Sequence, residues 1–356
     1  MTEPAAPPPG GPLLTVEDLM VSFATEEGTV QAVDGVSLEL SPGEVLAVVG
    51  ESGSGKSVTA MTLLGLTRFP NARFEGTAHY KGTELIGADD DVLRRVRGAE
   101  IAMIFQDPMT SLNPVQKIGK QIIEQIQEHE GSPDAEARER TIELLERVGI
   151  PRARERVDNY PFEFSGGMRQ RVMIAMALSC NPSVLIADEP TTALDVTIQA
   201  QILQRIRDLR DETGAAVILV THDLGVVADL ADRIAVMYAG RIVEQGTLDD
   251  VFYDPQHPYT WGLLGSITRV DRPRPERLPA IAGLPPSLAD RPQGCHFRPR
   301  CPHEFSECVK VPLLESRLDG RRGHKDRCWL PPSEKRVKRE VQPGEIGLGS
   351  KEGAAA

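Results

Sequence analysis

The spacing of apolar and polar residues changes along the chain, and each spacing predicts a different kind of structure. From residue 13 to about 105, short apolar runs alternate with turns, and 38–40 and 44–49 are predicted strands joined by a turn at 41–43. From about 107 to 164, apolar residues recur at helical spacing, which predicts helices over 118–129 and 135–148. The first part of the chain is therefore expected to be β-rich and the next part helical.

Strands and helices alternate from about residue 165 to 238. The apolar runs 184–187 and 216–220 suit buried parallel strands, so the pattern predicts an α/β sheet with its sites at the carboxyl ends of the strands. Beyond about residue 250 the composition shifts to Pro, Arg, His and Cys with little periodicity, which indicates a small appended module over 251–332. The main domain is expected over 13–250, with disordered ends over 1–12 and 333–356.

Composition and charge restrict the class of protein. The 356 residues are 40% hydrophobic and 26% charged, ordinary values for a soluble globular protein. No apolar stretch is long enough to span a membrane and no signal peptide is present, so we expect a cytoplasmic protein that reaches a membrane only through a partner. The net charge of −12 argues against a nucleic-acid role, because phosphate backbones select basic surfaces.

A phosphate-binding loop is the strongest motif. Residues 50–57, Gly-Glu-Ser-Gly-Ser-Gly-Lys-Ser, follow an apolar strand and precede a helical run, which is the context that this motif requires. Its backbone N–H groups and the helix N-terminus favour phosphate oxygens. Lys56 is expected to reach the β- and γ-phosphates of ATP, and Ser57 to ligate Mg²⁺. The predicted nucleotide-binding residues of this loop are Gly50, Ser52, Gly53, Ser54, Gly55, Lys56, Ser57 and Val58.

A second predicted strand ends in two carboxylates, Asp188 and Glu189. Two acids at the end of a buried strand need a metal or hydrogen-bond partners, because burying an unpaired charge is costly. Beside a phosphate loop, Asp188 is expected to hold the Mg²⁺ shell, and Glu189 to orient or polarise the attacking water.

A third motif resembles the signature of ABC ATPases: Ser165-Gly166-Gly167-Met168-Arg169-Gln170. Phe164 replaces the usual Leu before it, and Met168 replaces the usual Gln. The resemblance implies that Ser165, Gly166 and Gly167 meet the γ-phosphate of an ATP bound by a partner cassette. It also implies a P-loop NTPase (RecA-like) α/β core, an antiparallel β subdomain and a helical subdomain at about 107–164.

Other family elements occur in the order that the resemblance implies. Gln106 matches the loop that links the γ-phosphate and Mg²⁺ site to the membrane subunits, and is expected to be a Mg²⁺ ligand as well. Asp195 belongs to a segment that resembles the D-loop, which implies that it binds the nucleotide. His222 matches the switch histidine that contacts the γ-phosphate, and Phe23 the aromatic residue that stacks on adenine. With Glu189, Gln106 and His222 form the expected catalytic set. Phe23 equally suits an ordinary core position.

Two local sequences resemble the oligopeptide/dipeptide importer branch: residues 105–114 and His257-Pro258-Tyr259-Thr260. The family implies a second cassette, as a paralogue in a heterodimer, two transmembrane permeases and an extracytoplasmic peptide-binding protein, with this chain on the cytoplasmic face of the membrane. The alternatives are an importer cassette for another small solute such as nickel, a soluble ABC ATPase acting on nucleic acid or ribosomes, and an exporter cassette.

Four of the five cysteines, Cys295, Cys301, Cys308 and Cys328, lie near the end of the chain at gaps of five, six and nineteen residues. Clustered cysteines in a cytosolic protein favour metal over disulfides. Thiolates suit either Zn²⁺ or an iron–sulfur cluster, with His296, His303 and His324 as possible substitute ligands, and metal-free reduced cysteines are the plain alternative. The family resemblance implies a 4Fe–4S cluster here. Cys180 is expected to be a core residue.

Overall fold

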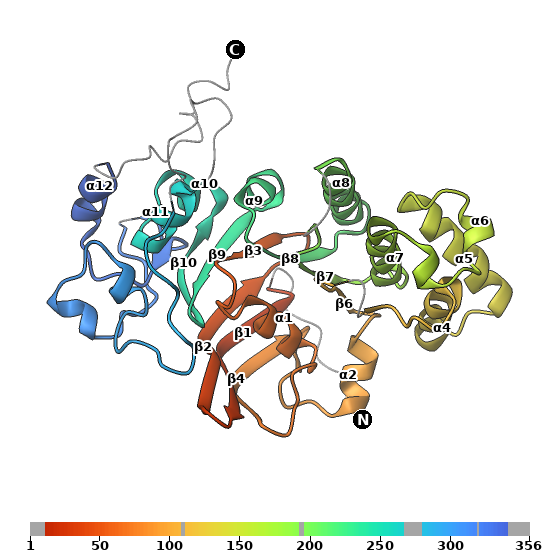
Figure 1. The fold of residues 1–356 in the computed structure, drawn as a ribbon, viewed down its shortest axis with the longest axis horizontal. Helices are drawn as coiled ribbons and strands as arrows, with labels where there is room; N and C mark the ends of the chain where they lie inside the picture. Colours follow the sequence, from red (N-terminus) through yellow and green to blue (C-terminus); the bar gives the residue numbers. More distant parts are fainter. Residues whose placement is uncertain (1–10, 108–110, 192–195, 267–279, 319, 341–356) are drawn as a thin grey trace, which may run out of the picture.

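A computed structural model describes residues 11–107, 111–191, 196–266, 280–318 and 320–340. Its larger sheet has the strand order β11-β10-β9-β3-β8-β7-β6 and runs through the middle of the molecule (Figure 1). The five strands from β9 to β6 pair in parallel, whereas β10 and β11 join antiparallel at one edge. The bounds are β3 (Val45–Val49), β6 (Ile101–Ile104), β7 (Val184–Asp188), β8 (Ala216–Thr221), β9 (Arg233–Tyr238), β10 (Arg241–Thr247) and β11 (Lys325–Asp326).

The predicted parallel strands are confirmed because their apolar runs are buried on both faces. Every residue of β3, β7 and β8 is buried, as expected for a parallel sheet that other layers cover on both sides. All three strands end at the same edge. That edge therefore collects the residues that follow them.

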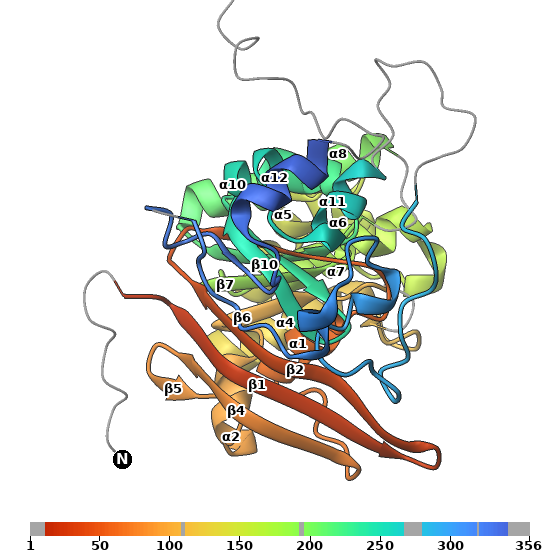
Figure 2. The same ribbon diagram turned by 90° about the vertical axis from the view of Figure 1, so that its left-hand side faces the viewer.

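The second sheet is antiparallel, with the order β2-β1-β4-β5. Its strands are β1 (Leu14–Thr25), β2 (Gly28–Leu40), β4 (Ala72–Tyr80) and β5 (Thr83–Glu84). The β1–β2 hairpin is long and projects from the body of the molecule (Figure 2). Its buried side chains share one core cluster with α1 (Lys56–Leu63), α2 (Asp90–Val96) and one face of the larger sheet.

The helical part lies at one end of the molecule, beside β6 (Figure 1). It contains α4 (Ile118–Glu130), α5 (Asp134–Arg147), α6 (Ala153–Arg156), the 3-10 helix η1 (Pro161–Glu163) and α7 (Gly166–Leu178). Helix α4 buries Ile118, Ile122 and Ile126, the helical spacing from which it was predicted. Gly119 allows α4 to approach the segment after α6, because an added Cβ would lie 2.3 Å from Val157 Cγ2.

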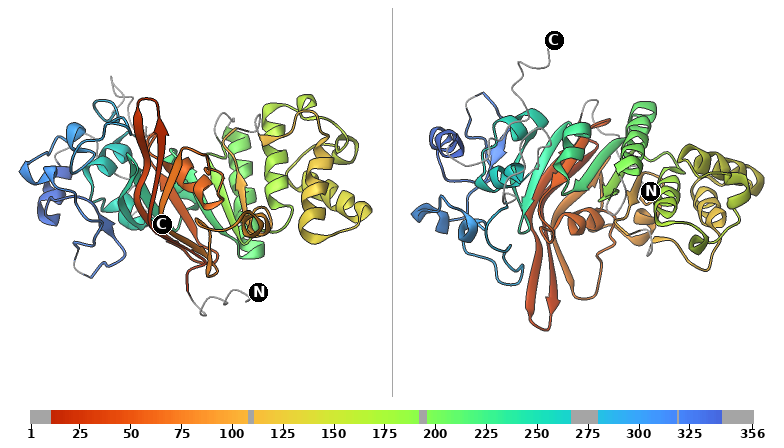
Figure 3. Two further views of the ribbon diagram at one scale, coloured as in Figure 1. Left: turned by 90° about the horizontal axis from the view of Figure 1, so that it is seen from below. Right: turned by 45° about the horizontal axis from the view of Figure 1, so that its top comes forward.

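Helices α8 (Val196–Thr213) and α9 (Leu224–Leu230) follow β7 and β8 along the upper side of Figure 1. At the other end of the molecule lie α10 (Leu248–Tyr253), α11 (Pro258–Gly265), the 3-10 helices η2 (Arg298–Arg300) and η3 (Ser306–Val309), and α12 (Pro332–Glu340). This C-terminal part packs beside β10 and opposite the helical part (Figure 3).

The C-terminal part is joined to the larger sheet and its core more closely than the predicted appended module would be. Strand β11 pairs with β10 in the larger sheet, with Glu244 opposite Asp326. Phe297 is buried in the same core cluster as β3 and β7. The segment has little periodicity of its own because it mainly completes an existing sheet and core, and adds a small separate cluster of Trp261, Cys328 and Leu330.

The end of the described chain also differs from the expectation of disorder from residue 333. Helix α12 continues to Glu340. Lys335 is 1% exposed, and its Nζ donates to Asp326 Oδ1 at 2.6 Å. A polar composition suggested a solvated tail, but this buried ion pair attaches the helix to β11. Residues 341–356 and most of the predicted N-terminal disorder lie outside the described residues.

Across the described ranges, no helix combines the length and apolar character needed to cross a membrane.

Candidate nucleotide site

The phosphate loop joins β3 to α1 at the edge where the parallel strands end. Two of its glycines are required by close backbone approaches. Gly50 has φ 157° and Gly55 has φ 101°. A Cβ on Gly50 would lie 2.1 Å from the Met237 carbonyl oxygen, and one on Gly55 would lie 2.3 Å from that of Ala32. Larger residues at these two positions would displace the loop from β9 and β2.

Lys56 is folded into this loop. Its Nζ donates to the carbonyl oxygens of Gly50 at 2.8 Å and Glu51 at 2.9 Å, and to Ser54 Oγ at 3.3 Å. Burial lowers the pKa of Lys56, while the nearby charges of Glu189 and Asp188 oppose that shift. The ammonium group is therefore fixed at the loop by acceptors that also define the loop's shape.

A cavity with about 530 Å³ of empty space, some of it open to solvent, lies beside the loop. It brings together nine of the predicted site residues, from the loop and from the ends of β6 and β7. They are Ser52, Gly53, Ser54, Gly55, Lys56, Ser57, Val58, Gln106 and Glu189.

Ser57 and Asp188 meet across the end of the sheet. Ser57 Oγ donates to Asp188 Oδ1 at 3.0 Å. Asp188 is only 4% exposed, and burial raises the pKa of its carboxyl group. A hydroxyl and a carboxylate so close together, next to a phosphate loop, are the donor set that suits Mg²⁺ in P-loop enzymes.

Glu189 is held between two side chains from other elements. Gln106 Nε2 donates to Glu189 Oε2 at 3.0 Å, and His222 Nδ1 lies 3.2 Å from Glu189 Oε1. Glu189 has φ 47°, and its backbone N–H donates to the Val220 carbonyl oxygen at 2.8 Å. This left-handed conformation turns the chain sharply away from β7 at the carboxylate.

The signature residues are placed elsewhere. Ser165 begins α7 as its N-cap, with Oγ accepting a hydrogen bond from the Met168 backbone N–H at 3.3 Å. Ser165 and Gly166 are exposed, and neither they nor Gly167 line the cavity of their own chain.

Phe23 and Asp195 are two further predicted site residues. Phe23 lies on β1, with its ring centroid 6.4 Å from that of Phe69, and does not line the cavity. Asp195 lies outside the described residues. The adenine-stacking role of Phe23 stays a prediction.

The structure adds a residue that the motifs do not indicate. Leu288, from the C-terminal part, lines the cavity beside the phosphate loop. Its carbonyl oxygen accepts a hydrogen bond from the Gln31 backbone N–H at 3.3 Å. No local pattern marks Leu288, because its position depends on a contact between segments far apart in the sequence.

All four C-terminal cysteines line a second, smaller cavity. Burial raises the pKa values of the Cys295, Cys301 and Cys328 thiols. The backbone groups of Phe297, His303 and Leu330, each two residues further on, act to lower these pKa values and so oppose the effect of burial. Even so, within the described ranges no three His, Cys, Asp or Glu side chains are placed to hold a metal ion.

Two known protein families match separate parts of this chain. The ABC transporter family matches residues 33–192, and the oligopeptide/dipeptide transporter C-terminal region matches residues 243–308. A dimeric bacterial ABC transporter cassette, MJ0796, is structurally similar, with a TM-score of 0.60 and 29% identity over 66% of this chain and 98% of that one.

Curated relatives extend the similarity over nearly the whole chain. The oligopeptide transport ATP-binding protein OppD of Salmonella typhimurium is 51% identical over 90% of this chain and 95% of its own length. The dipeptide transport ATP-binding protein DppD of Bacillus subtilis is 50% identical over 94% and 98%. The chain belongs to the oligopeptide/dipeptide transport ATP-binding proteins of the ABC transporter family.

Proposed function

We propose that the chain hydrolyses ATP to power peptide import through an ABC transporter. The observation that carries this proposal is the position of Glu189, held by Gln106 and His222 at the rim of the phosphate-loop cavity. A carboxylate fixed next to a phosphate site is positioned to activate water for attack on the γ-phosphate. The names of the relatives identify peptides as the transported class.

Each residue of the site has a part in this reaction. Lys56 and the N–H groups of the loop bind the β- and γ-phosphates, and Ser57 and Asp188 hold Mg²⁺. When bound, Mg²⁺ neutralises part of the phosphate charge. Glu189 accepts the proton of the attacking water, while Gln106 and His222 fix the direction of its carboxylate.

A second cassette completes the site. Ser165, Gly166 and Gly167 do not line the cavity of their own chain, and Ser165 and Gly166 are exposed at the start of α7, which leaves them available to another chain's nucleotide. We propose that the partner is a paralogue, and that Phe23 and Asp195 contact the nucleotide, Phe23 at its adenine. The remaining partners are two permeases and an extracytoplasmic peptide-binding protein, and this chain acts at the cytoplasmic face of the membrane.

The domain organisation that we propose has the cassette over 13–250, with its helical subdomain at about 107–164, followed by the cysteine-bearing part over 251–332. In that last part, Cys295, Cys301, Cys308 and Cys328 would ligate a 4Fe–4S cluster. One observation supports this proposal: the four cysteines line one cavity. Thiolates are the ligands of such clusters.

Purification of the tagged chain from native membranes in mild detergent tests the transport function. We expect a second cassette and two membrane proteins to accompany it, and ATP hydrolysis to rise when a peptide-loaded binding protein is added. Purification without membrane proteins, together with a shift of DNA or ribosomal RNA at physiological salt, would overturn the proposal in favour of a nucleic-acid ATPase. Stimulation by a nickel-loaded binding protein, and not by a peptide-loaded one, would overturn the peptide assignment alone.

A further inference from the structure

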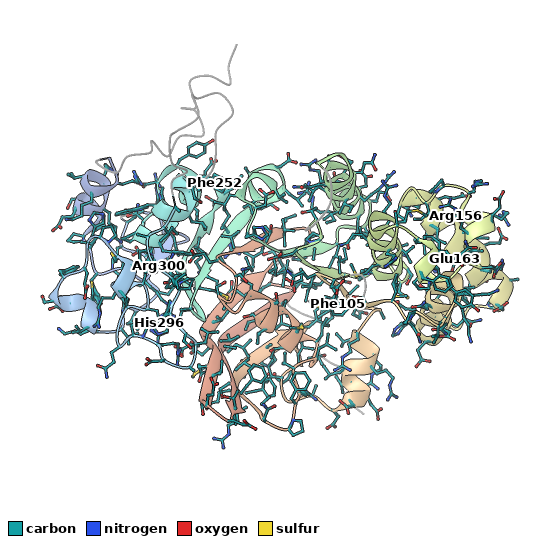
Figure 4. All side chains as sticks on the ribbon, in the orientation of Figure 1. Phe105, Arg156, Glu163, Phe252, His296 and Arg300 are labelled. Carbon is teal, nitrogen blue, oxygen red and sulfur yellow. The ribbon has the colours of Figure 1, made fainter. Side chains whose placement is uncertain are left out.

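The C-terminal part contacts the phosphate loop through a partly buried ion pair. Arg300 Nη1 donates to Glu51 Oε2 at 2.6 Å, and Arg300 Nη2 donates to Glu51 Oε1 at 3.0 Å. Glu51 is the second residue of the loop, whereas Arg300 ends η2 and directly precedes Cys301. Figure 4 shows Arg300 where the C-terminal part meets the central strands. A two-point contact of this kind fixes the direction of both side chains as well as their separation.

Contacts other than the one with Glu51 also hold the Arg300 guanidinium group in place. The Arg300 side chain is 4% exposed. Its Nε donates to the Ala282 carbonyl oxygen at 3.0 Å, and its Nη1 donates to Tyr238 Oη at 3.2 Å. The Tyr238 and Phe297 rings lie 5.8 Å and 5.9 Å from Cζ. Arg300 therefore has little freedom to follow Glu51 if the loop moves, and Glu51 must conform to Arg300.

Glu51 also carries two backbone contacts that shape the loop. Its N–H donates to Tyr259 Oη at 2.8 Å, from α11 of the C-terminal part. Its carbonyl oxygen accepts from Lys56 Nζ at 2.9 Å. A chain of direct contacts thus runs from Arg300 through Glu51 to the lysine that is assigned to the phosphates.

We propose that Arg300 is a positioning residue for ATP binding, through which the C-terminal part sets the conformation of the phosphate loop. Arg300 does not touch the nucleotide; it fixes Glu51, and Glu51 fixes the backbone that surrounds Lys56. The inference rests on the proposed function to the extent that the loop binds ATP. It gives the C-terminal part a role in nucleotide affinity in addition to any structural one.

Equilibrium titration of the full chain with Mg²⁺-ATP tests this role in Arg300→Gln. We expect the Kd for ATP to rise about tenfold, as expected when a charge-assisted hydrogen bond is lost. In the assembled transporter the same variant should raise KM for ATP by a similar factor and change kcat far less, because the residues around Glu189 are untouched. Arg298→Gln is the matched control, since Arg298 pairs with Glu304 at 3.2 Å instead of with the loop.

Glu51→Gln removes the same ion pair from the other side and keeps the test decisive if Arg300→Gln folds poorly. Its Kd should rise to the same extent, and the double variant should be no weaker than either single one, since all three lack one shared interaction. A lower melting temperature with an unchanged Kd in both single variants would overturn the inference and leave a structural contact only. Failure of the unaltered chain to bind ATP would instead count against the proposed function.

Discussion

His222 Nδ1 lies 3.2 Å from Glu189 Oε1, while the Gln106 amide holds the other oxygen of the same carboxylate. Gln106 follows β6, Glu189 follows β7 and His222 follows β8, which are three neighbouring strands of the parallel sheet. The Glu189 carboxylate is therefore held between side chains that the order of the strands brings together.

Glu189→Gln removes the proton acceptor and leaves a side chain of nearly the same shape. We expect ATP to bind with an affinity close to that of the unaltered chain, and turnover to fall by about 10²- to 10⁴-fold, the usual contribution of a positioned general base. Single-turnover hydrolysis and equilibrium ATP binding, measured on the same preparation, separate the two effects. Near-normal turnover in this variant would exclude Glu189 as the base.

Lys56→Ala tests the binding of ATP and not its hydrolysis. The buried ammonium group contacts the loop and faces the phosphate cavity, so its loss should weaken Mg²⁺-ATP binding by roughly ten- to a hundredfold, the effect of one hydrogen bond to a charged group. Isothermal titration calorimetry measures this directly. Lys81→Ala, which alters a lysine at the distant Glu100 contact, is the control that should bind ATP normally.

The grouping of the candidate site residues was largely predictable because most of the motifs are local, while Gln106 and His222 were expected from the family resemblance. The loop at 50–57 and the acids at 188–189 are contiguous runs, and the rule that parallel strands end at one edge brings Gln106, Glu189 and His222 together. The parallel strands β3, β7 and β8 were equally visible, since continuous apolar runs suit strands that are buried on both faces.

Contacts between distant segments were not predictable. Arg300 and Glu51 are 249 positions apart, and no spacing rule links an arginine to a loop glutamate at that distance. Strand β11 has only two residues and pairs at the sheet edge because β10 offers it a free side, not because its own sequence favours a strand. The same limit explains why Leu288 at the cavity was missed.

Cys301→Ser tests the proposed cluster. Anaerobically purified chain should contain about four irons and absorb broadly as thiolate–iron charge transfer, and the variant should lose iron and melt at a lower temperature, since metal binding there is coupled to folding. Cys180→Ser is the matched control, because Cys180 lies beside Ser179 and Gln125 in the helical part. Equal iron content in the variant and the unaltered chain would remove Cys301 from the ligand set. Stoichiometric zinc without colour would replace the cluster with a zinc site.

The stability of the C-terminal part should depend on pH through His324. Its side chain is fully buried, with Nε2 2.8 Å from Glu244 Oε1. Burial acts to lower the pKa of His324, but the Glu244 hydrogen bond and the charges of Glu244, Asp250 and Asp254 together raise it above its ordinary value of 6.5. A histidine whose pKa is higher in the folded than in the unfolded chain stabilises the fold when protonated. That stabilisation is fully present below the unfolded pKa and is lost as the pH rises through the folded one.

Thermal unfolding between about pH 6 and pH 9 measures this dependence. The melting temperature should fall as the pH rises, and His324→Gln should be less stable than the unaltered chain at the acidic end but show a flatter profile. His79→Gln removes a histidine whose side chain is 44% exposed on β4, and should keep the profile of the unaltered chain. If His324→Gln kept the full slope, the pH dependence would have to arise elsewhere, and the buried pair with Glu244 would not require a protonated imidazole.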